Sequence, residues 1–104
     1  MALAADLPEL GVGARVHGRL DRLAITDDKI FIVDFKSNRT PPTKLEDVPV
    51  YYATQMALYR MALSKIFPGR RIGSALIWTQ GPVLMPLPDE FLDAQTRRIR
   101  SRLT

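Results

Sequence analysis

A chain of 104 residues, with 46% hydrophobic and 25% charged residues, has the size and composition of one globular domain and excludes an intrinsically disordered chain. The absence of cysteine excludes disulfides, thiolate zinc sites and iron–sulfur clusters. Fifteen Lys and Arg against eleven Asp and Glu give a net charge of +4, which suits a polyanionic partner without identifying one.

Three common functional segments are missing from the sequence. No apolar run approaches the ~20 residues that cross a bilayer, so we expect no membrane association. Residues Met1 to Glu9 contain no basic side chain and therefore do not resemble a signal peptide. The sequence also lacks a Gly-rich phosphate loop that ends in Lys-Ser or Lys-Thr, so nucleotide hydrolysis is not expected.

The first predicted elements form a β-hairpin. Residues 1–13 are small, apolar and Gly-containing and predict an irregular lead-in or an edge strand. Two strand-like segments, Ala14–Ile25 and Lys29–Lys36, follow on either side of the turn-forming pair Asp27-Asp28. The second segment reads KIFIVDFK, and this β-branched and aromatic run is typical of a central strand that is covered on both faces.

The position of the turn sets the register of this hairpin. Paired residues then have numbers that sum to 55, which places Asp21 opposite Asp34 and Arg19 opposite Lys36. Opposed residues have Cβ atoms ~5 Å apart, so the two carboxylates would repel each other unless a cation lies between them. A divalent metal beside Lys36 fits this arrangement. The alternative is a different register, with one aspartate as a surface charge at the end of a strand.

A long helix is predicted after a loop. Ser37–Thr43 contains Pro41-Pro42 and is expected to be irregular, and a helix should run from Asp47, as its N-cap, to Phe67, before Pro68-Gly69. At ~100° per residue, one face of this helix carries Tyr52, Gln55, Tyr59, Ala62 and Ile66, and the opposite face carries Arg60 and Ser64. Gln55 interrupts an apolar stripe, so it needs a local hydrogen-bond partner or a polar cavity.

The C-terminal part predicts a second hairpin and a last helix. Ser74–Thr79 reads as a strand, Gln80-Gly81-Pro82 as a turn, Val83–Leu87 as the partner strand, and Pro88-Asp89-Glu90 as a helix start. The arginines between 97 and 102 either match the C-terminal dipole of this helix or contact phosphates. The predicted fold class is α/β, with a central mixed β-sheet flanked by helices.

Three segments resemble a known family. GRLDRL (Gly18–Leu23), IVDFKSN (Ile32–Asn38) and QMALYRMAL (Gln55–Leu63) look like successive motifs of the PD-(D/E)xK nuclease superfamily, in its RecB-like branch. The C-terminal nuclease domain of AddA-type subunits of double-strand-break repair helicase–nucleases is the closest resemblance, and LIWTQGPVLMPLP (Leu76–Pro88) shares it. The resemblance implies a restriction-endonuclease-like core and a metal-dependent deoxyribonuclease, of exonuclease type.

The resemblance also implies roles for individual residues. Asp21 and Asp34 would be carboxylate ligands of Mg²⁺, for which Mn²⁺ substitutes, and the carbonyl of Phe35 would add a third oxygen. Lys36 would position the attacking water or help to deprotonate it. The remaining family positions, which would line the site beside the DNA strand, are Gln55 and Tyr59, while Arg19 is the candidate for a phosphate contact.

One feature departs from the family pattern. Related nucleases draw a further acid or histidine from an N-terminal helix, but Asp6 and Glu9 lie in a Pro/Gly-rich lead-in, and His17 is interpreted as an exposed strand residue. We therefore expect residues 1–104 to be the nuclease core domain of a larger protein, N-terminally truncated and weakly active or inactive alone.

The resemblance also implies partners and a location. DNA, as a single strand or a duplex end, and a second subunit of the helicase–nuclease are the expected partners, and the fragment itself could form oligomers. The expected location is the bacterial cytoplasm, at the nucleoid. Two alternatives stay open: a non-catalytic nuclease-like module for DNA binding or subunit interaction, and a stand-alone nuclease of the CRISPR-adaptation type. The lack of cysteine disfavours the iron–sulfur form of the latter.

Overall fold

The computed structural model describes residues 2–11, 13–19, 21–37, 41–80 and 83–102. The elements in chain order are β1 (Ala2–Asp6), the 3₁₀ turn η1 (Pro8–Leu10), β2 (Arg15–Arg19), β3 (Arg22–Ile25), β4 (Lys29–Lys36), the 3₁₀ turn η2 (Leu45–Asp47), α1 (Val50–Ile66), β5 (Arg71–Trp78), β6 (Val83–Leu87) and α2 (Asp89–Ser101). No helix within these ranges is long and apolar enough to cross a membrane.

The strands form two sheets. The larger has the order β3-β4-β5-β6, in which β4 and β5 are parallel and the other neighbours are antiparallel. Helix α1 makes the crossover between the two parallel strands, as a βαβ unit requires. The smaller sheet is the antiparallel pair β1-β2. The predicted α/β class with a central mixed sheet is confirmed.

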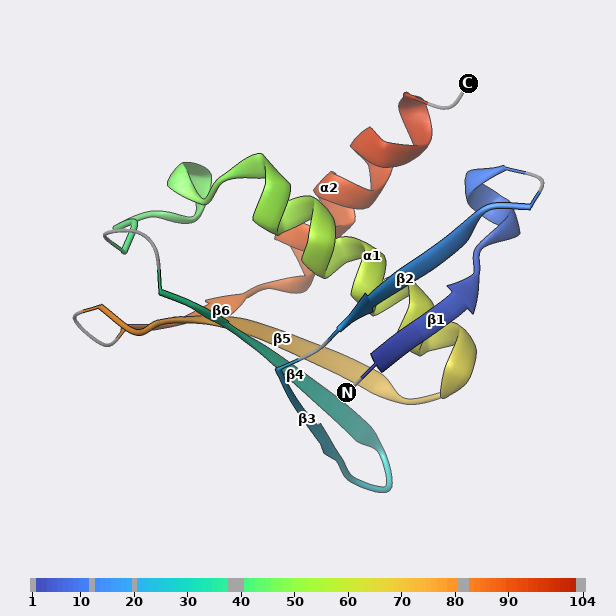
Figure 1. Cartoon of the computed structure of the whole chain (residues 1–104), viewed down its shortest axis with the longest axis horizontal. Coiled ribbons are helices and arrows are strands. Elements are labelled where there is room, and N and C mark those ends of the chain that lie inside the picture. The colour runs from blue at the N-terminus through green and yellow to red at the C-terminus, as the bar shows by residue number, and fades with distance from the viewer. Residues whose placement is uncertain (1, 12, 20, 38–40, 81–82, 103–104) are drawn as a thin grey trace.

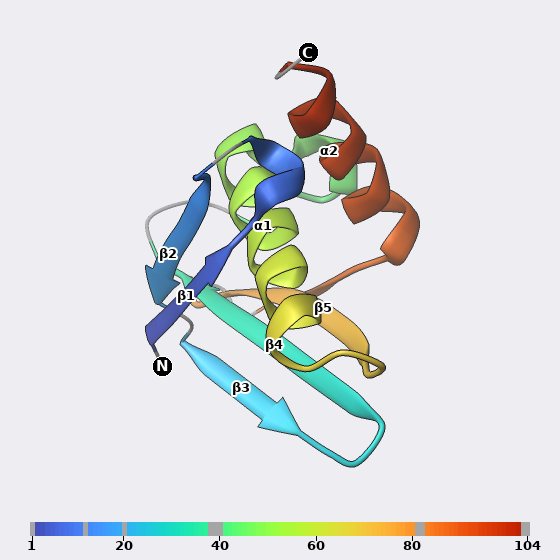
Figure 2. The same ribbon diagram turned by 90° about the vertical axis from the view of Figure 1, so that its right-hand side faces the viewer.

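Helix α1 lies at the centre of the molecule. Figures 1 and 2 show both helices on the same side of the four-stranded sheet. The β1-β2 pair lies on one side of α1, and α2 lies on the opposite side of α1 (Figure 2). Helix α1 contacts both sheets and α2, and one core cluster contains residues from all of them. The most deeply buried large side chains of this core cluster include Ile30, Ile32, Met56, Leu76 and Trp78.

Only one face of the central sheet is covered within the described residues. Burial alternates along β4, where Ile30, Ile32 and Asp34 point toward the helices and are buried. On the outer face, the side chains of Phe35 and Leu84 are 40% and 58% exposed. The prediction that β4 is covered on both faces is therefore wrong, because α1 and α2 both pack on one face.

The predicted hairpin is correct in register but not in length. β3 pairs with β4 from Arg22↔Val33 to Ile25↔Ile30, and these numbers sum to 55 as predicted. The predicted strand from residue 14 is divided, however, because β2 belongs to the other sheet, where Arg19 pairs with Ala2. The prediction that Arg19 lies opposite Lys36 is wrong, since β1 supplies the partner strand to β2.

Helix α1 begins later than predicted and ends where expected. Its N-cap is Pro49, while Asp47 closes the preceding 3₁₀ turn, so Asp47 as N-cap is wrong. Proline disfavours a helical conformation in the residue before it, and Val48 is accordingly extended. Phe67 is the C-cap, and Gly69 follows with a φ of +85° that favours glycine.

The C-terminal elements largely confirm the predictions. β5 begins at Arg71, three residues early, because it pairs with β4 over its whole length. Val83–Leu87 and a helix that begins after Pro88 are as predicted, whereas Gly81-Pro82 of the predicted turn lies outside the described residues. Gln95 is an unpredicted buried polar residue, and its Nε2 donates to Thr54 Oγ1 at 2.8 Å, which ties α2 to α1.

Two leucines provide a matched test of this one-sided packing. Leu92 on α2 is 1% exposed, and Leu84 on the outer sheet face is 58% exposed. We expect Leu92→Ala to lower the free energy of unfolding by about 2–5 kcal/mol, because it leaves a cavity, and Leu84→Ala to lower it by less than about 1 kcal/mol. Urea denaturation measures both, and equal losses would show that the outer face is buried in solution.

Candidate active site

Two aspartates meet where β3 and β4 begin their pairing. Asp21 lies in a bend directly before β3, and Asp34 is buried near the end of β4, on the face that carries Ile30 and Ile32. The carboxyl groups of Asp21 and Asp34 are joined by a hydrogen bond. The opposed carboxyl pair that the hairpin register predicts is therefore present.

Backbone and lysine contacts hold this pair in place. The amide N–H of Phe35 donates to Asp21 Oδ2 at 2.9 Å, so the exposed aspartate is attached to β4. Lys36, whose side chain is 11% exposed, forms an ion pair with Asp34. Because residues two apart on a strand point to the same face, the alternation of β4 itself brings Asp34 and Lys36 together.

The contacts continue from Lys36 onto helix α1. Lys36 Nζ donates to Gln55 Oε1 at 3.1 Å, and Gln55 Nε2 donates to Tyr59 OH at 3.1 Å. The Tyr59 hydroxyl in turn donates to the backbone carbonyl of Arg19 at 3.4 Å. Both ends of the Gln55 amide are thus satisfied by site residues. The expectation that Gln55 has a local partner is confirmed.

Gly18 allows Tyr59 to reach this position. A Cβ atom at Gly18 would lie 2.4 Å from Tyr59 Cε1 and 2.6 Å from its hydroxyl oxygen, which is closer than real Cβ contacts allow. The glycine of the GRLDRL segment therefore makes room for an aromatic ring from a helix about forty residues later in the sequence. The sequence analysis gave Gly18 no role, since a glycine in a strand does not reveal what approaches it.

Tyr52 is a second residue whose role the sequence analysis missed. Lys36 Nζ lies 4.1 Å from the centroid of the Tyr52 ring, within the range of a cation–π interaction. The ring also packs against Trp78 at a centroid distance of 5.8 Å. Helical spacing had placed Tyr52 on the same face as Gln55 and Tyr59, and this spacing was the available signal. Tyr52 thus supports the ammonium group of Lys36.

The two carboxyl groups have pKa values displaced in opposite directions. Burial raises the pKa of Asp34 above its ordinary value, and the hydrogen bond with Asp21 adds to this rise, while Lys36 acts against it. The hydrogen bond from Asp34 lowers the pKa of Asp21, and the Phe35 amide lowers it further. The two carboxyl groups therefore titrate apart, and Asp34 keeps its proton to a higher pH than Asp21 does.

The donor set fits a hard divalent cation. A cation at this place would find carboxylate oxygens from Asp21 and Asp34, the donors that Mg²⁺ and Mn²⁺ prefer. Phe35 is at the site through its amide N–H, whereas ligation by its carbonyl stays a prediction. Among the described residues no cluster of three or more His, Cys, Asp or Glu side chains could hold a metal ion. Within this part of the chain, the candidate acidic ligands at the site are therefore the carboxylates of Asp21 and Asp34.

The other N-terminal candidates are engaged elsewhere. Asp6 Oδ1 accepts a hydrogen bond from Arg15 at 2.8 Å, and Glu9 forms an ion pair with Lys65 at 3.4 Å. The side chain of His17 lies outside the described part of the chain. The backbone carbonyl of Arg19 accepts the hydrogen bond from Tyr59, and the residue is exposed. That the Arg19 side chain contacts a phosphate stays a prediction.

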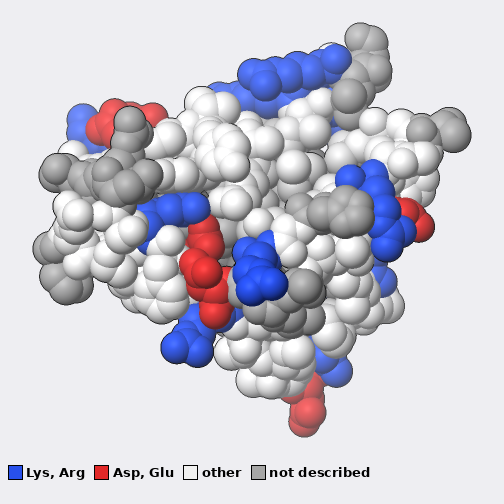
Figure 3. All heavy atoms as spheres, in the orientation of Figure 1, with Lys and Arg blue, Asp and Glu red and all other residues white. Residues whose placement is uncertain are grey.

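The surface around the site carries both signs of charge. Figure 3 shows acidic atoms exposed near the middle of this face, over the region where β3 and β4 meet, with basic side chains on either side. A divalent cation would be attracted to the acidic centre, and phosphate groups to the basic flanks. The arrangement suits a substrate whose negatively charged backbone must approach two carboxylates.

The site thus combines a carboxylate pair, a lysine two residues after the second acid, and a helix that lines them, which is the arrangement that the sequence motifs predict for a nuclease. A sequence profile described as the PD-(D/E)XK nuclease superfamily matches residues 2–99, and the chain belongs to this superfamily. Asp34-Phe35-Lys36 supplies the (D/E)XK element of that description. Members generally use divalent metals, and DNA is the substrate class that membership implies. A search of curated proteins finds no match.

The raised pKa of Asp34 predicts a pH-dependent stability difference. The folded protein binds this proton more tightly than the unfolded chain, so the stabilisation is complete below the unfolded pKa of about 3.9 and is lost as the pH rises through the folded value. The substitution Asp34→Asn replaces the titrating carboxyl group with an amide, which does not titrate and can still donate a hydrogen bond to Asp21. Relative to wild type, the variant should become more stable as the pH rises from about 3.9 through the raised folded pKa of Asp34. Urea denaturation in EDTA measures this, and parallel curves would contradict it.

The contact between Gly18 and Tyr59 predicts coupled substitutions. Gly18→Ala should displace the Tyr59 ring and lower the free energy of unfolding by about 1–3 kcal/mol, since the added carbon has no space. The same change in a Tyr59→Leu background should cost less, because the ring is absent. A double-mutant cycle by thermal denaturation gives the coupling energy. A coupling energy of zero would show that the ring does not occupy this position in solution.

Proposed function

We propose that this protein is a Mg²⁺-dependent deoxyribonuclease domain, with Mn²⁺ as a substitute, that hydrolyses DNA phosphodiesters as part of a bacterial double-strand-break repair helicase–nuclease. The observation that carries the proposal is the convergence of Asp21, Asp34 and Lys36 with Gln55 from α1. Exonuclease action and a location at the nucleoid in the cytoplasm follow from the resemblance to AddA-type subunits.

In this proposal each charged residue has a separate task. Asp21 and Asp34 would hold the cation through their carboxylate oxygens, and the Phe35 carbonyl would add a further oxygen. When bound, such a cation lowers the pKa of water and stabilises charge on the phosphate. Lys36 Nζ is fixed by Asp34 and Gln55, and it orients the attacking water or helps to remove its proton.

The remaining residues position the DNA strand. Gln55 and Tyr59 lie on the helix face that borders Lys36, so a strand beside them passes next to the carboxylates. Arg19 stands at the end of β2, where its carbonyl already contacts Tyr59, and its side chain is exposed. A guanidinium in this place would bind a phosphate of the strand.

Two features support a place within a larger assembly. The described residues provide two acidic ligands and no third, so another part of a longer protein or a partner subunit would complete the site. The outer face of the central sheet leaves Phe35 and Leu84 exposed, and such apolar surface is usual where another part of an assembly packs. Residues 1–104 are accordingly proposed as the nuclease core domain.

A second candidate function is a nuclease-like module that binds DNA or a partner subunit without hydrolysis. The incomplete ligand set favours it, because two carboxylates hold Mg²⁺ weakly when substrate oxygens are absent. The retained pair Asp21 and Asp34 disfavours it, because opposed carboxyl groups and a buried aspartate cost stability that a binding module does not require.

The two functions differ in their response to one substitution. Asp34→Asn should abolish Mg²⁺ or Mn²⁺ binding in calorimetry and lower cleavage of labelled single-stranded DNA by about three orders of magnitude, because a metal ion contributes several kcal/mol of transition-state stabilisation. The matched control is Asp27→Asn, which removes an equal charge from the exposed hairpin turn and should leave binding and cleavage unchanged.

Each result assigns the protein to one class. Cleavage that is lost in Asp34→Asn and kept in Asp27→Asn establishes a nuclease. Metal binding without cleavage, even after a longer chain is supplied, favours the non-catalytic module. A wild-type protein that binds no divalent metal contradicts the proposed nuclease.

A further inference from the structure

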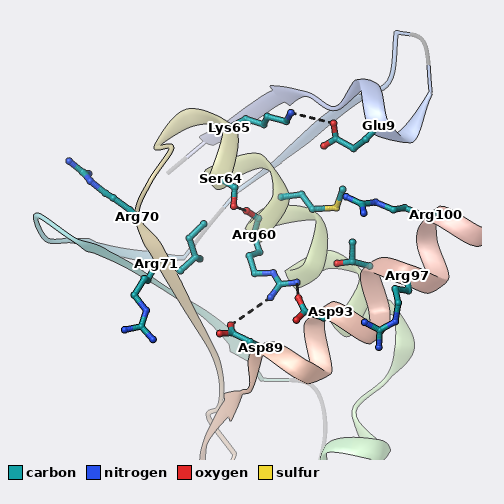
Figure 4. Close-up of a pocket in the computed structure, with 13 residues that line it drawn as sticks. Glu9, Arg60, Ser64, Lys65, Arg70, Arg71, Asp89, Asp93, Arg97 and Arg100 are labelled. Carbon is teal, nitrogen blue, oxygen red and sulfur yellow. Dashed lines mark hydrogen bonds and ion pairs between the residues drawn. The ribbon is translucent and has the colours of Figure 1, made fainter.

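A cavity of about 770 Å³ lies on the other side of α1 from the candidate active site. It is bordered by α1, α2 and the beginning of β5, as Figure 4 shows. Its lining contributes Arg60 and Ser64 from α1, whereas Gln55 and Tyr59 on the same helix face the carboxylate pair. The cavity is therefore separated from the proposed catalytic residues by the body of the helix.

Each acidic side chain in the cavity already forms an ion pair. Arg60 is 15% exposed and forms ion pairs with Asp93 at 2.6 Å and with Asp89 at 3.6 Å. Lys65 pairs with Glu9 at 3.4 Å. These contacts join α1 to α2 and to η1, and Figure 4 shows them inside the ring of lining residues. Their role is structural, because they hold α1 against α2 and η1.

Four further arginines have no ion pair among the described residues. The cavity is lined by six basic and three acidic side chains, a net charge of +3, and the unpaired ones are Arg70, Arg71, Arg97 and Arg100. Arg70 packs over the Phe67 ring at 5.3 Å, which orients it without neutralising it. In Figure 4, Arg70 and Arg71 lie on the β5 side of the cavity and Arg97 and Arg100 on the α2 side.

Helix electrostatics explains only half of this charge. The C-terminal dipole of α2 stabilises Arg97 and Arg100, although these residues are three apart on one helix and repel each other. The dipole has no bearing on Arg70 and Arg71, which precede and begin β5. Two unrelated elements thus place unpaired arginines at the edges of one hollow, with the side chains of Arg70 and Arg71 directed away from its centre in Figure 4, and the net positive charge attracts a polyanion.

We propose that this cavity binds the phosphate backbone of single-stranded nucleic acid, as a second site that is separate from the catalytic residues. The inference rests on the proposed nuclease function for its choice of polyanion. A small anion requires donors that converge on one point, whereas these arginines are spread over two sides of an open cavity, as a chain of phosphates requires. The contacts are to the backbone, so binding is independent of base sequence.

The test compares two arginines on one helix. Arg100→Glu changes the cavity, and Arg102→Glu makes the same charge change on the exposed end of α2, outside the cavity lining. Binding of labelled oligo-dT is measured in EDTA over a series of salt concentrations, with Arg71→Glu as the variant on the opposite side. Arg100→Gln serves in place of Arg100→Glu if circular dichroism shows that the latter is unfolded.

We expect the cavity variants to weaken binding about tenfold and to reduce the slope of log Kd against log salt by about 0.7 for each lost contact. Arg102→Glu should retain the wild-type slope. Equal effects of Arg100→Glu and Arg102→Glu would overturn the proposal, because overall charge alone would then explain binding. Displacement of oligo-dT by poly-glutamate at equal charge would also overturn it in favour of an acidic protein partner.

The measurement separates this inference from the proposed function. It requires neither a metal nor cleavage, so binding of oligo-dT through the cavity is measured whether or not the protein cleaves DNA. If the cavity binds oligo-dT and cleavage is absent even in a longer chain, the result would contradict the nuclease proposal alone. A wild-type protein that does not bind oligo-dT at low salt would overturn the cavity proposal, whatever its activity. Cleavage together with loss of binding only in the cavity variants would support both.

Discussion

The packing of helix α1 between two sheets is the constraint on which the structure depends. One side of α1 meets the central sheet, another meets the β1-β2 pair, and a third meets α2. The contact of Tyr59 with Gly18 fixes the second of these, because any larger residue at position 18 would push the helix or the strand away. With the helix held there, Gln55 reaches Lys36, and the residues of three distant segments become one hydrogen-bonded group.

The candidate site is held at an electrostatic cost. Asp34 continues the buried face of Ile30 and Ile32, in a position where an apolar residue would be more stable. The cost is reduced in two ways, by the ion pair with Lys36 and by the hydrogen bond between the carboxyl groups of Asp34 and Asp21. Both compensations leave oxygens that a divalent cation can take, so the strain of the metal-free pair and its suitability for a metal have the same origin.

Helix α1 also separates two regions of different charge. On one side it borders an acidic centre with exposed carboxyl oxygens, and on the other side it borders a basic cavity in which the acids are already paired. A cation is attracted to the first and phosphates to the second. Because the two regions share no residue, substitutions in one can be interpreted without disturbing the other.

Local sequence patterns determined the hairpin register, the helix that carries Gln55 and Tyr59, and the second hairpin, because strand alternation, helical periodicity and Pro or Gly boundaries act over a few residues. The opposed pair Asp21 and Asp34 and its neighbour Lys36 followed from that register alone. Only the tertiary structure divided the first strand between two sheets, since pairing of β2 with β1 competes with extension along β4. It alone also brought Gly18 to Tyr59, covered one face of the central sheet, and formed an open basic cavity bordered by α1, α2 and the beginning of β5. These features depend on contacts between segments that are distant in sequence, and no local propensity encodes such contacts.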